Sequence, residues 1–159
     1  FKEPASFHFA DKAVKVPGLD GTGKMGKSEG NCLYLCDDEK TVTKKIMRAV
    51  TDQGPTQLNQ EKPEVIQNLF TLCELLSGKE AADYYNDLYN NMQIRYGDMK
   101  KQMAADANIL LAPIRERILA YSSDDALLDR IMRQGAEKAA ARAEKTIEEV
   151  REIIGFRKI

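Results

Sequence analysis

The sequence predicts a mainly α-helical protein: a helical bundle preceded by the trailing edge of an α/β domain. Two observations lead to this fold class. Beyond residue 36 the apolar residues recur at helical spacing, and capping or terminating residues separate the helical stretches. Residues 18–31 are instead rich in glycine and lysine, and they follow a short alternating segment, 13–16, that is typical of a strand. We therefore expect a boundary between residues 1–36 and residues 37–159.

Each expected helix lies between residues that favour helix ends. Asp37 and Asp38 are expected to cap a first helix that runs to about residue 51, after a short extended or strand segment at 32–35. Pro63 and Gly78 bound the second helix. A third helix is expected at about 80–92, and a fourth from a cap at Asp98 to about residue 119, with a kink at Pro113. The next helix is expected to begin at Asp124 and to turn its apolar residues inward: Leu127, Leu128, Ile131 and Met132. After a bend or break at Gly135, a last helix is expected at about 136–154.

Composition places the chain among globular proteins of about one domain. Its 159 residues are 43% hydrophobic and 31% charged, and the formal net charge is −1. No apolar run approaches the ~18 residues of a membrane span, so we expect no membrane contact. Three cysteines, Cys32, Cys36 and Cys73, and a single histidine, His8, supply too few ligands for a zinc site. We expect free thiols, no metal held by the protein's own side chains, and a cytoplasmic location.

Three nucleotide-binding patterns overlap within residues 18–31. Gly21, Gly26, Lys27 and Ser28 match the P-loop spacing G-x-x-x-x-G-K-S, while Gly21, Gly23 and Gly26 match the dinucleotide fingerprint G-x-G-x-x-G. The third pattern, Lys24-Met25-Gly26-Lys27-Ser28, places two ammonium groups three residues apart with a hydroxyl beside them. Such a set suits the charge that develops on a departing pyrophosphate.

The residues after Ser28 favour the third pattern. A P-loop and a dinucleotide fingerprint both require a helix that begins at once, so that its N-terminal amides meet the phosphates. Here Glu29-Gly30-Asn31 breaks a helix, and only helical stretches follow residue 36, which leaves no later strand to carry an acidic partner. An ordinary glycine- and lysine-rich surface turn also fits this stretch.

Three segments resemble one known family. Residues 15–31, 35–52 and 135–152 are similar to the bacterial-type tryptophanyl-tRNA synthetases, and 24–28 resemble the Lys-Met-Ser-Lys-Ser loop of class I synthetases. The likeness covers essentially the whole chain but only the C-terminal half of the family's length. Gly26 stands where the family usually has serine, and the family's His-Ile-Gly-His motif is absent.

The resemblance implies a function for each part of the chain. Residues 1–36 would be the end of a Rossmann-like class I catalytic domain, and 37–159 a helical bundle of the anticodon-binding type. The parent enzyme would activate tryptophan with ATP and Mg²⁺ and transfer it to tRNA(Trp), as a cytoplasmic homodimer, and the chain alone would be inactive. The implied catalytic residues are Lys24, Lys27 and Ser28, and the implied ATP-binding residues are Val16, Lys24, Met25, Gly26, Lys27 and Ser28.

Two alternatives remain open from the residues alone: a P-loop hydrolase or kinase, and a noncatalytic helical module that binds RNA or a protein. Residues 20–30 are expected to be mobile without ATP, because they hold several glycines and a single apolar anchor, Met25. Weak, salt-sensitive tRNA contacts are expected from a basic-leaning set of residues: Arg95, Lys100, Lys101, Arg115 and Arg117.

Overall fold

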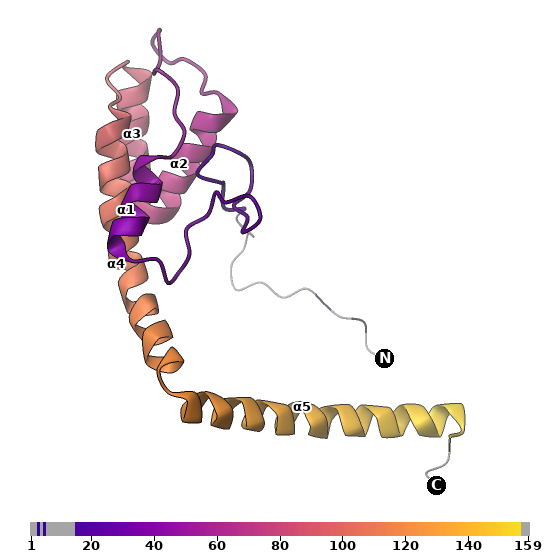
Figure 1. Cartoon of the computed structure of the whole chain (residues 1–159). Helices are drawn as coiled ribbons and strands as arrows, with labels where there is room; N and C mark the ends of the chain where they lie inside the picture. Colours follow the sequence, from indigo (N-terminus) through magenta and orange to yellow (C-terminus); the bar gives the residue numbers. More distant parts are fainter. Residues whose placement is uncertain (1–2, 4, 6–14, 157–159) are drawn as a thin grey trace. The chain divides into compact units, whose positions relative to one another are not determined.

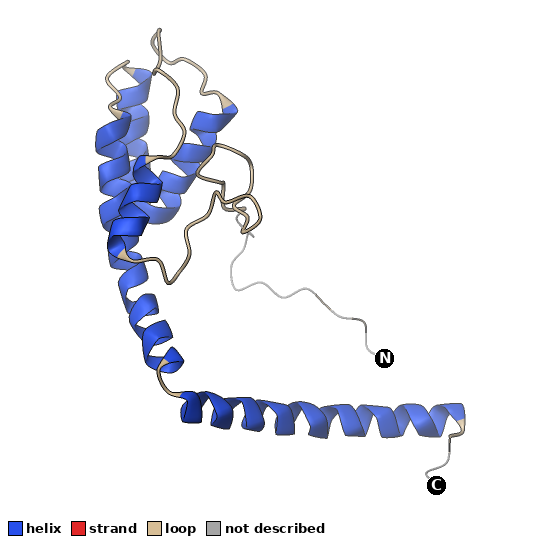
Figure 2. Cartoon of the chain, viewed as in Figure 1, coloured by secondary structure: helices blue, strands red, loops and turns tan. Residues whose placement is uncertain are grey.

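The computed structural model describes residues 3, 5 and 15–156, and within them all regular structure is helical (Figures 1 and 2). His8 and the first half of the expected strand at 13–16 lie outside the described residues. The helices are α1 Glu39–Met47, α2 Glu64–Ser77, α3 Lys79–Asn90, α4 Tyr96–Ser122 and α5 Asp125–Ile154. The mainly helical fold class is therefore confirmed, whereas residues 32–34 form irregular chain rather than a strand.

The chain divides into two compact units, residues 1–115 and residues 116–159. In the first unit, α1, α2, α3 and the first part of α4 surround a common core. α2 and α3 form a helical hairpin around Gly78, whose φ of 84° lies in the region that favours glycine. The largest fully buried side chains of this core are Tyr89, Ile46, Ile66, Met99, Met103, Val42 and Cys73.

Local hydrogen bonds mark the starts of α1 and α4. The Asp38 side chain accepts a hydrogen bond from the amide of Thr41 at 2.7 Å, as the sequence predicts. Asp98 is not a cap: α4 already begins at Tyr96, because the Asp98 amide donates to the carbonyl of Arg95. The hydroxyl of Tyr96 also donates to Asp52 at 2.7 Å, which holds the start of α4 against the connection after α1.

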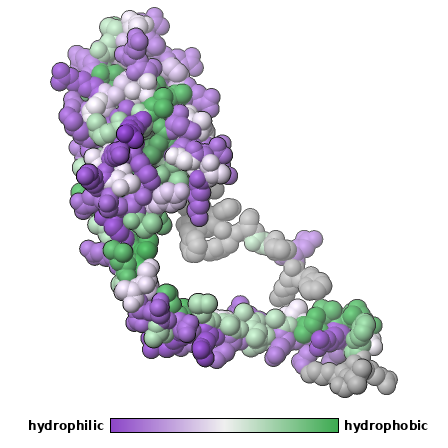
Figure 3. All heavy atoms as spheres, viewed as in Figure 1, coloured by the Kyte–Doolittle hydropathy of each residue, from purple (hydrophilic) through white to green (hydrophobic). Residues whose placement is uncertain are grey.

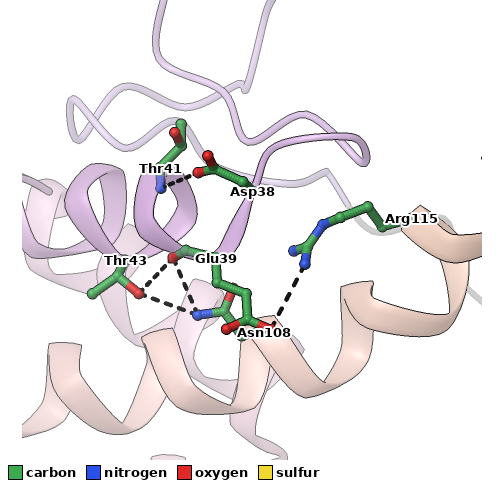
Figure 4. A network of polar contacts seen from close by, with 6 residues as sticks. All are labelled: Asp38, Glu39, Thr41, Thr43, Asn108 and Arg115. Carbon is green, nitrogen blue, oxygen red and sulfur yellow. Dashed lines mark hydrogen bonds and ion pairs between the residues drawn. The ribbon is translucent and has the colours of Figure 1, made fainter. Parts of the chain in front are cut away.

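Side chains of α4 hold the first turn of α1 (Figure 4). The Asn108 amide donates to the hydroxyl of Thr43 at 3.1 Å and to the carbonyl of Glu39 at 3.4 Å. The Arg115 guanidinium lies 3.9 Å from the Glu39 carboxylate, and Arg115 is largely buried. These contacts hold the start of α1 against α4.

α5 is one uninterrupted helix of 30 residues, so the expected break at Gly135 is wrong. Asp124 caps its start by accepting from the Leu127 amide at 2.8 Å, and Gly155 ends it with a left-handed φ of 78°. A single glycine lowers helix stability by only about 1 kcal/mol relative to alanine, and a long alanine-rich helix tolerates that cost. α4 likewise continues through Pro113, where a kink stays a prediction.

No residue of α5 is buried, which overturns the expected inward packing of its apolar residues. Ile131 and Met132 are exposed, whereas Leu127 and Leu128 are partly covered. Figure 3 shows apolar atoms interspersed with polar ones along this helix. The second unit contains only α5 and the end of α4, so no further helix of that unit covers the apolar positions. Among the described helices, none has both the length and the hydropathy that a membrane span needs.

Candidate nucleotide-binding loop

The chain doubles back on itself between residues 16 and 25. The amide of Met25 donates to the carbonyl of Val16 at 2.8 Å, and the amide of Gly18 donates to the carbonyl of Thr22 at 3.0 Å. Gly21 has a φ of 82°, a conformation that residues with a side chain rarely adopt. We call residues 16–31 the glycine loop.

Asp20 organises the tip of the glycine loop. Its Oδ1 accepts from the Thr22 amide at 3.1 Å and from the Thr22 hydroxyl at 2.8 Å. Partial burial acts to raise the pKa of this carboxyl, but the hydrogen bonds from Asn31 and Thr22 outweigh it, so the pKa lies below the usual value of 3.8. Asp20 therefore carries a full negative charge at neutral pH.

The helical core anchors the glycine loop through contacts with Leu19, Gly21 and Met25. The Leu19 side chain belongs to the core, and the Leu19 carbonyl accepts from the amide of Val50 at 2.9 Å. From α2, the Asn68 amide donates to the carbonyl of Gly21 at 2.9 Å. Met25 packs against the same core. Loop and helices are thus joined by both apolar and hydrogen-bonded contacts.

The loop surrounds an open hollow of about 440 Å³, which we call the loop hollow. Its lining consists of Lys15, Asp20, Thr22, Gly23, Lys24, Gly26, Ser28 and Glu29. A Cβ added to Gly23 would lie 3.4 Å from the ammonium of Lys15, which shows how closely that ammonium approaches the loop backbone. A Cβ at position 23 would therefore make only an ordinary van der Waals contact with the flexible end of Lys15.

The structure brings together only part of the expected ATP-binding set. Lys24, Gly26 and Ser28 line the loop hollow, and the side chains of Lys24 and Ser28 are exposed there. Lys27 is exposed but does not line the hollow, and the Ser28 hydroxyl lies 3.4 Å from the Glu29 carboxylate. The other two expected residues face different surroundings, since Val16 is 40% exposed and Met25 contacts the core.

The alternative nucleotide motifs fail on geometry. Residues 27–30 form a turn, residues 31–34 are irregular, and α1 begins only at Glu39. Ser28 therefore does not open a helix, which both the P-loop and the dinucleotide fingerprint require.

Exposed ammonium groups beside an open hollow fit the phosphates of a nucleotide. Lys15, Lys24 and Lys27 supply flexible positive charges, and backbone amides of a glycine-rich turn can approach an anion closely. Within the described residues no cluster of three His, Cys, Asp or Glu side chains could hold a metal ion.

Two residues of the site escaped sequence reasoning. Asn31 is 5% exposed and hydrogen-bonds along the whole glycine loop, and Asn68 reaches the loop from α2. An asparagine directly after a glycine-rich turn is a weak sign of such a role, because asparagine amides often bond to nearby backbone. Nothing in the sequence marks Asn68, since it lies 47 residues from its partner.

The family of "tRNA synthetases class I (W and Y)" matches residues 1–112. The chain belongs to this family. Its likeness to the tryptophan-specific branch extends over nearly all its residues: it is 57% identical over 157 residues to the tryptophan–tRNA ligase of Porphyromonas gingivalis, covering 99% of the chain and 48% of the ligase. A second ligase, from Streptococcus pyogenes serotype M1, is 40% identical over 153 residues, with 92% of the chain and 44% of the ligase covered.

A solved synthetase shares the fold. The crystal structure of tryptophanyl-tRNA synthetase from Campylobacter jejuni, complexed with ADP and tryptophan, matches with a TM-score of 0.72 and 25% identity, covering 92% of this chain and 45% of that one. The chain therefore spans about half the length of the relatives it matches. The resemblance drawn from residues 15–31, 35–52 and 135–152 is confirmed.

Proposed function

We propose that this chain is the C-terminal half of a tryptophan–tRNA ligase, in which the glycine loop binds the phosphates of ATP and the helices contact tRNA(Trp). One observation carries the proposal. The loop backbone is anchored to the helical core, while the ammonium groups of Lys24 and Lys27 remain exposed. Relatives that match nearly the whole chain bear the name of this ligase, which supports the choice of substrate.

The chemistry that these lysines would serve is adenylate formation. The carboxylate of tryptophan attacks the α-phosphate of ATP, the bond to the β-phosphate breaks, and pyrophosphate leaves with its negative charge. Lys24 and Lys27 would stabilise that charge, and Ser28 would add a hydrogen bond. Val16, Met25 and the backbone of Gly26 would complete the contact with ATP.

The remaining partners belong to the same proposal. Mg²⁺ would enter bound to the phosphates of ATP. Tryptophan and the rest of the nucleotide would bind residues outside this chain, because the chain spans about half of its relatives. The ligase would act as a cytoplasmic homodimer, and the purified chain alone is expected to give no adenylate.

Replacement of Lys27 by alanine in the full-length ligase tests the proposal. The lysine meets charge that develops as pyrophosphate leaves, so its loss should slow adenylate formation and leave tryptophan binding nearly unchanged. We expect a roughly hundredfold lower rate, the typical effect of losing one such donor. Tryptophan-dependent exchange of pyrophosphate into ATP and pre-steady-state adenylate formation measure the rate.

The matched control is Lys40→Ala, which removes another exposed lysine from the first turn of α1. It should leave the exchange rate unchanged. A Lys27→Ala variant as active as the parent would refute the catalytic role of the loop, and exchange that depends on tyrosine rather than tryptophan would refute the substrate.

A further inference from the structure

The buried side chain of Asn31 forms hydrogen bonds with several residues of the glycine loop. Its Nδ2 donates to Asp20 Oδ1 at 3.0 Å, to Thr22 Oγ1 at 3.2 Å and to the carbonyl of Lys24 at 3.1 Å, and its Oδ1 accepts from the amide of Gly26 at 2.8 Å. Since Asn31 is only 5% exposed, water competes little for these bonds.

The opposite limb of the loop also closes on Asn31. The Asn31 carbonyl accepts from the amide of Leu19 at 2.9 Å, and Leu19 itself is part of the helical core. A Cβ added to Gly18 would lie 2.2 Å from Asn31 Nδ2, so the backbone at position 18 passes directly over the amide. Asn31 therefore joins a fixed limb to the limb that carries the lysines.

The bonds of Asn31 act on the backbone that carries both lysines. The carbonyl of Lys24 and the amide of Gly26 are held, while the side chains of Lys24 and Lys27 are exposed and free to reach a ligand. Because the backbone is held, the Cα atoms of both lysines have fixed positions, and less conformational entropy is lost when the nucleotide binds. Positioning of this kind contributes strongly to rate, and a shift of about 1 Å can cost on the order of a hundredfold.

We propose that Asn31 is a positioning residue for adenylate formation: it holds the glycine loop in the shape that presents Lys24 and Lys27 to the phosphates. This inference rests on the proposed function of the loop. It assigns to Asn31 no contact with ATP, and its effect on the reaction passes through the two lysines.

The test is a double-mutant cycle in the full-length ligase with Asn31→Ala, Lys27→Ala and the double variant. We expect Asn31→Ala to lower the rate of adenylate formation about ten- to hundredfold, with the KM for tryptophan unchanged. Lys27→Ala should lower the rate of adenylate formation much less in the Asn31→Ala background than in the parent enzyme, because the lysine is already misplaced there. Pre-steady-state adenylate formation supplies the rates.

A second variant guards against a simple loss of folding. Asn31→Asp keeps the shape and the acceptor for Gly26 but removes every donated bond and places a carboxylate beside Asp20. It should lose rate as Asn31→Ala does. Because the new carboxylate repels that of Asp20, we expect a lower melting temperature, and the rates of both variants are compared at a temperature where thermal unfolding shows them to be folded. Asn91→Ala is the matched control, since it removes an exposed asparagine whose amide donates to Asp87, and it should leave the rate unchanged.

The outcomes separate this inference from the proposed function. If Lys27→Ala has no effect, the proposed function of the loop fails. If Lys27→Ala slows the reaction but folded Asn31→Ala and Asn31→Asp do not, only the role of Asn31 is overturned. Fully additive losses in the double variant would also overturn it, because Asn31 would then act independently of Lys27.

Discussion

Lys100 and Lys101 are neighbours in α4, yet their side chains meet opposite environments. Lys100 is 7% exposed, and its ammonium donates to the carbonyl of Ala49 at 2.6 Å. Burial lowers the pKa of Lys100 below its usual value. Lys101 is exposed and lies 3.5 Å from the Asp98 carboxylate. Lys100 is therefore a structural contact between α4 and the connection that follows α1, and its prediction as a tRNA contact is wrong.

Alanine replacement of the two lysines should separate these roles. Lys100→Ala leaves the Ala49 carbonyl without its donor and removes a buried stem, so we expect a loss of about 2 kcal/mol in the free energy of unfolding. Lys101→Ala, the matched control, removes a surface ion pair and should cost less than about 0.5 kcal/mol. Urea unfolding of the two variants measures both values. Equal losses would show that Lys100 is solvated in solution.

At the scale of an element, α5 is a helix of 30 residues none of which is buried. It continues through Gly135. A Cβ added at Gly135 would meet nothing within 4 Å, so a larger residue fits there. Gly155 differs, since its φ of 78° ends the helix in a conformation that disfavours any other residue. Alanine is therefore expected to have opposite effects at Gly135, inside α5, and at Gly155, directly after it.

Gly135→Ala should stabilise α5 by about 0.5–1 kcal/mol, because alanine loses less backbone entropy in a helix. Gly155→Ala should destabilise its end by about 1 kcal/mol, because the left-handed conformation costs an L-residue that much. Hydrogen exchange of the α5 amides reports both changes. A destabilising Gly135→Ala would mean that the helix bends or breaks there, as the sequence alone suggested.

At the scale of the whole molecule, three of the five expected tRNA contacts remain available. Of the basic set, Lys100 is buried and Arg115 is largely buried beside Glu39. Arg95, Lys101 and Arg117 are exposed. With a formal net charge of −1, the chain has no general attraction for nucleic acid, so binding depends on such local groups.

We expect weak tRNA binding that falls steeply with salt. Each phosphate engaged should contribute about −0.7 to −0.9 to the slope of log affinity against log salt concentration. Arg95→Ala should reduce the slope by one such step, whereas Lys79→Ala, which removes an exposed lysine at the start of α3, should not. Filter binding of the purified chain across a salt series measures these slopes. No binding at low salt would show that tRNA recognition needs residues outside this chain.

Local chemistry in the sequence determined where several helices begin and end, and it predicted a synthetase-type loop. Pro63 and Gly78 bound α2 as expected, and Asp38 and Asp124 are caps because their carboxylates reach amides three residues away. The lysine spacing at 24 and 27 pointed to the synthetase loop, and the break after Ser28 argued against a P-loop. Such features depend on residues within a few positions of one another, so the sequence displays them directly.

Only the tertiary structure decided which residues act together across the chain. α1 ends at Met47 rather than near residue 51, where the Val50 amide instead donates to the Leu19 carbonyl. Asn31 reaches back 11 residues to Asp20, and Lys100 reaches 51 residues to Ala49. These hydrogen bonds join groups that the fold alone brings together. A buried polar group must find its partner wherever the packing places one, and periodicity and capping patterns carry no record of that place.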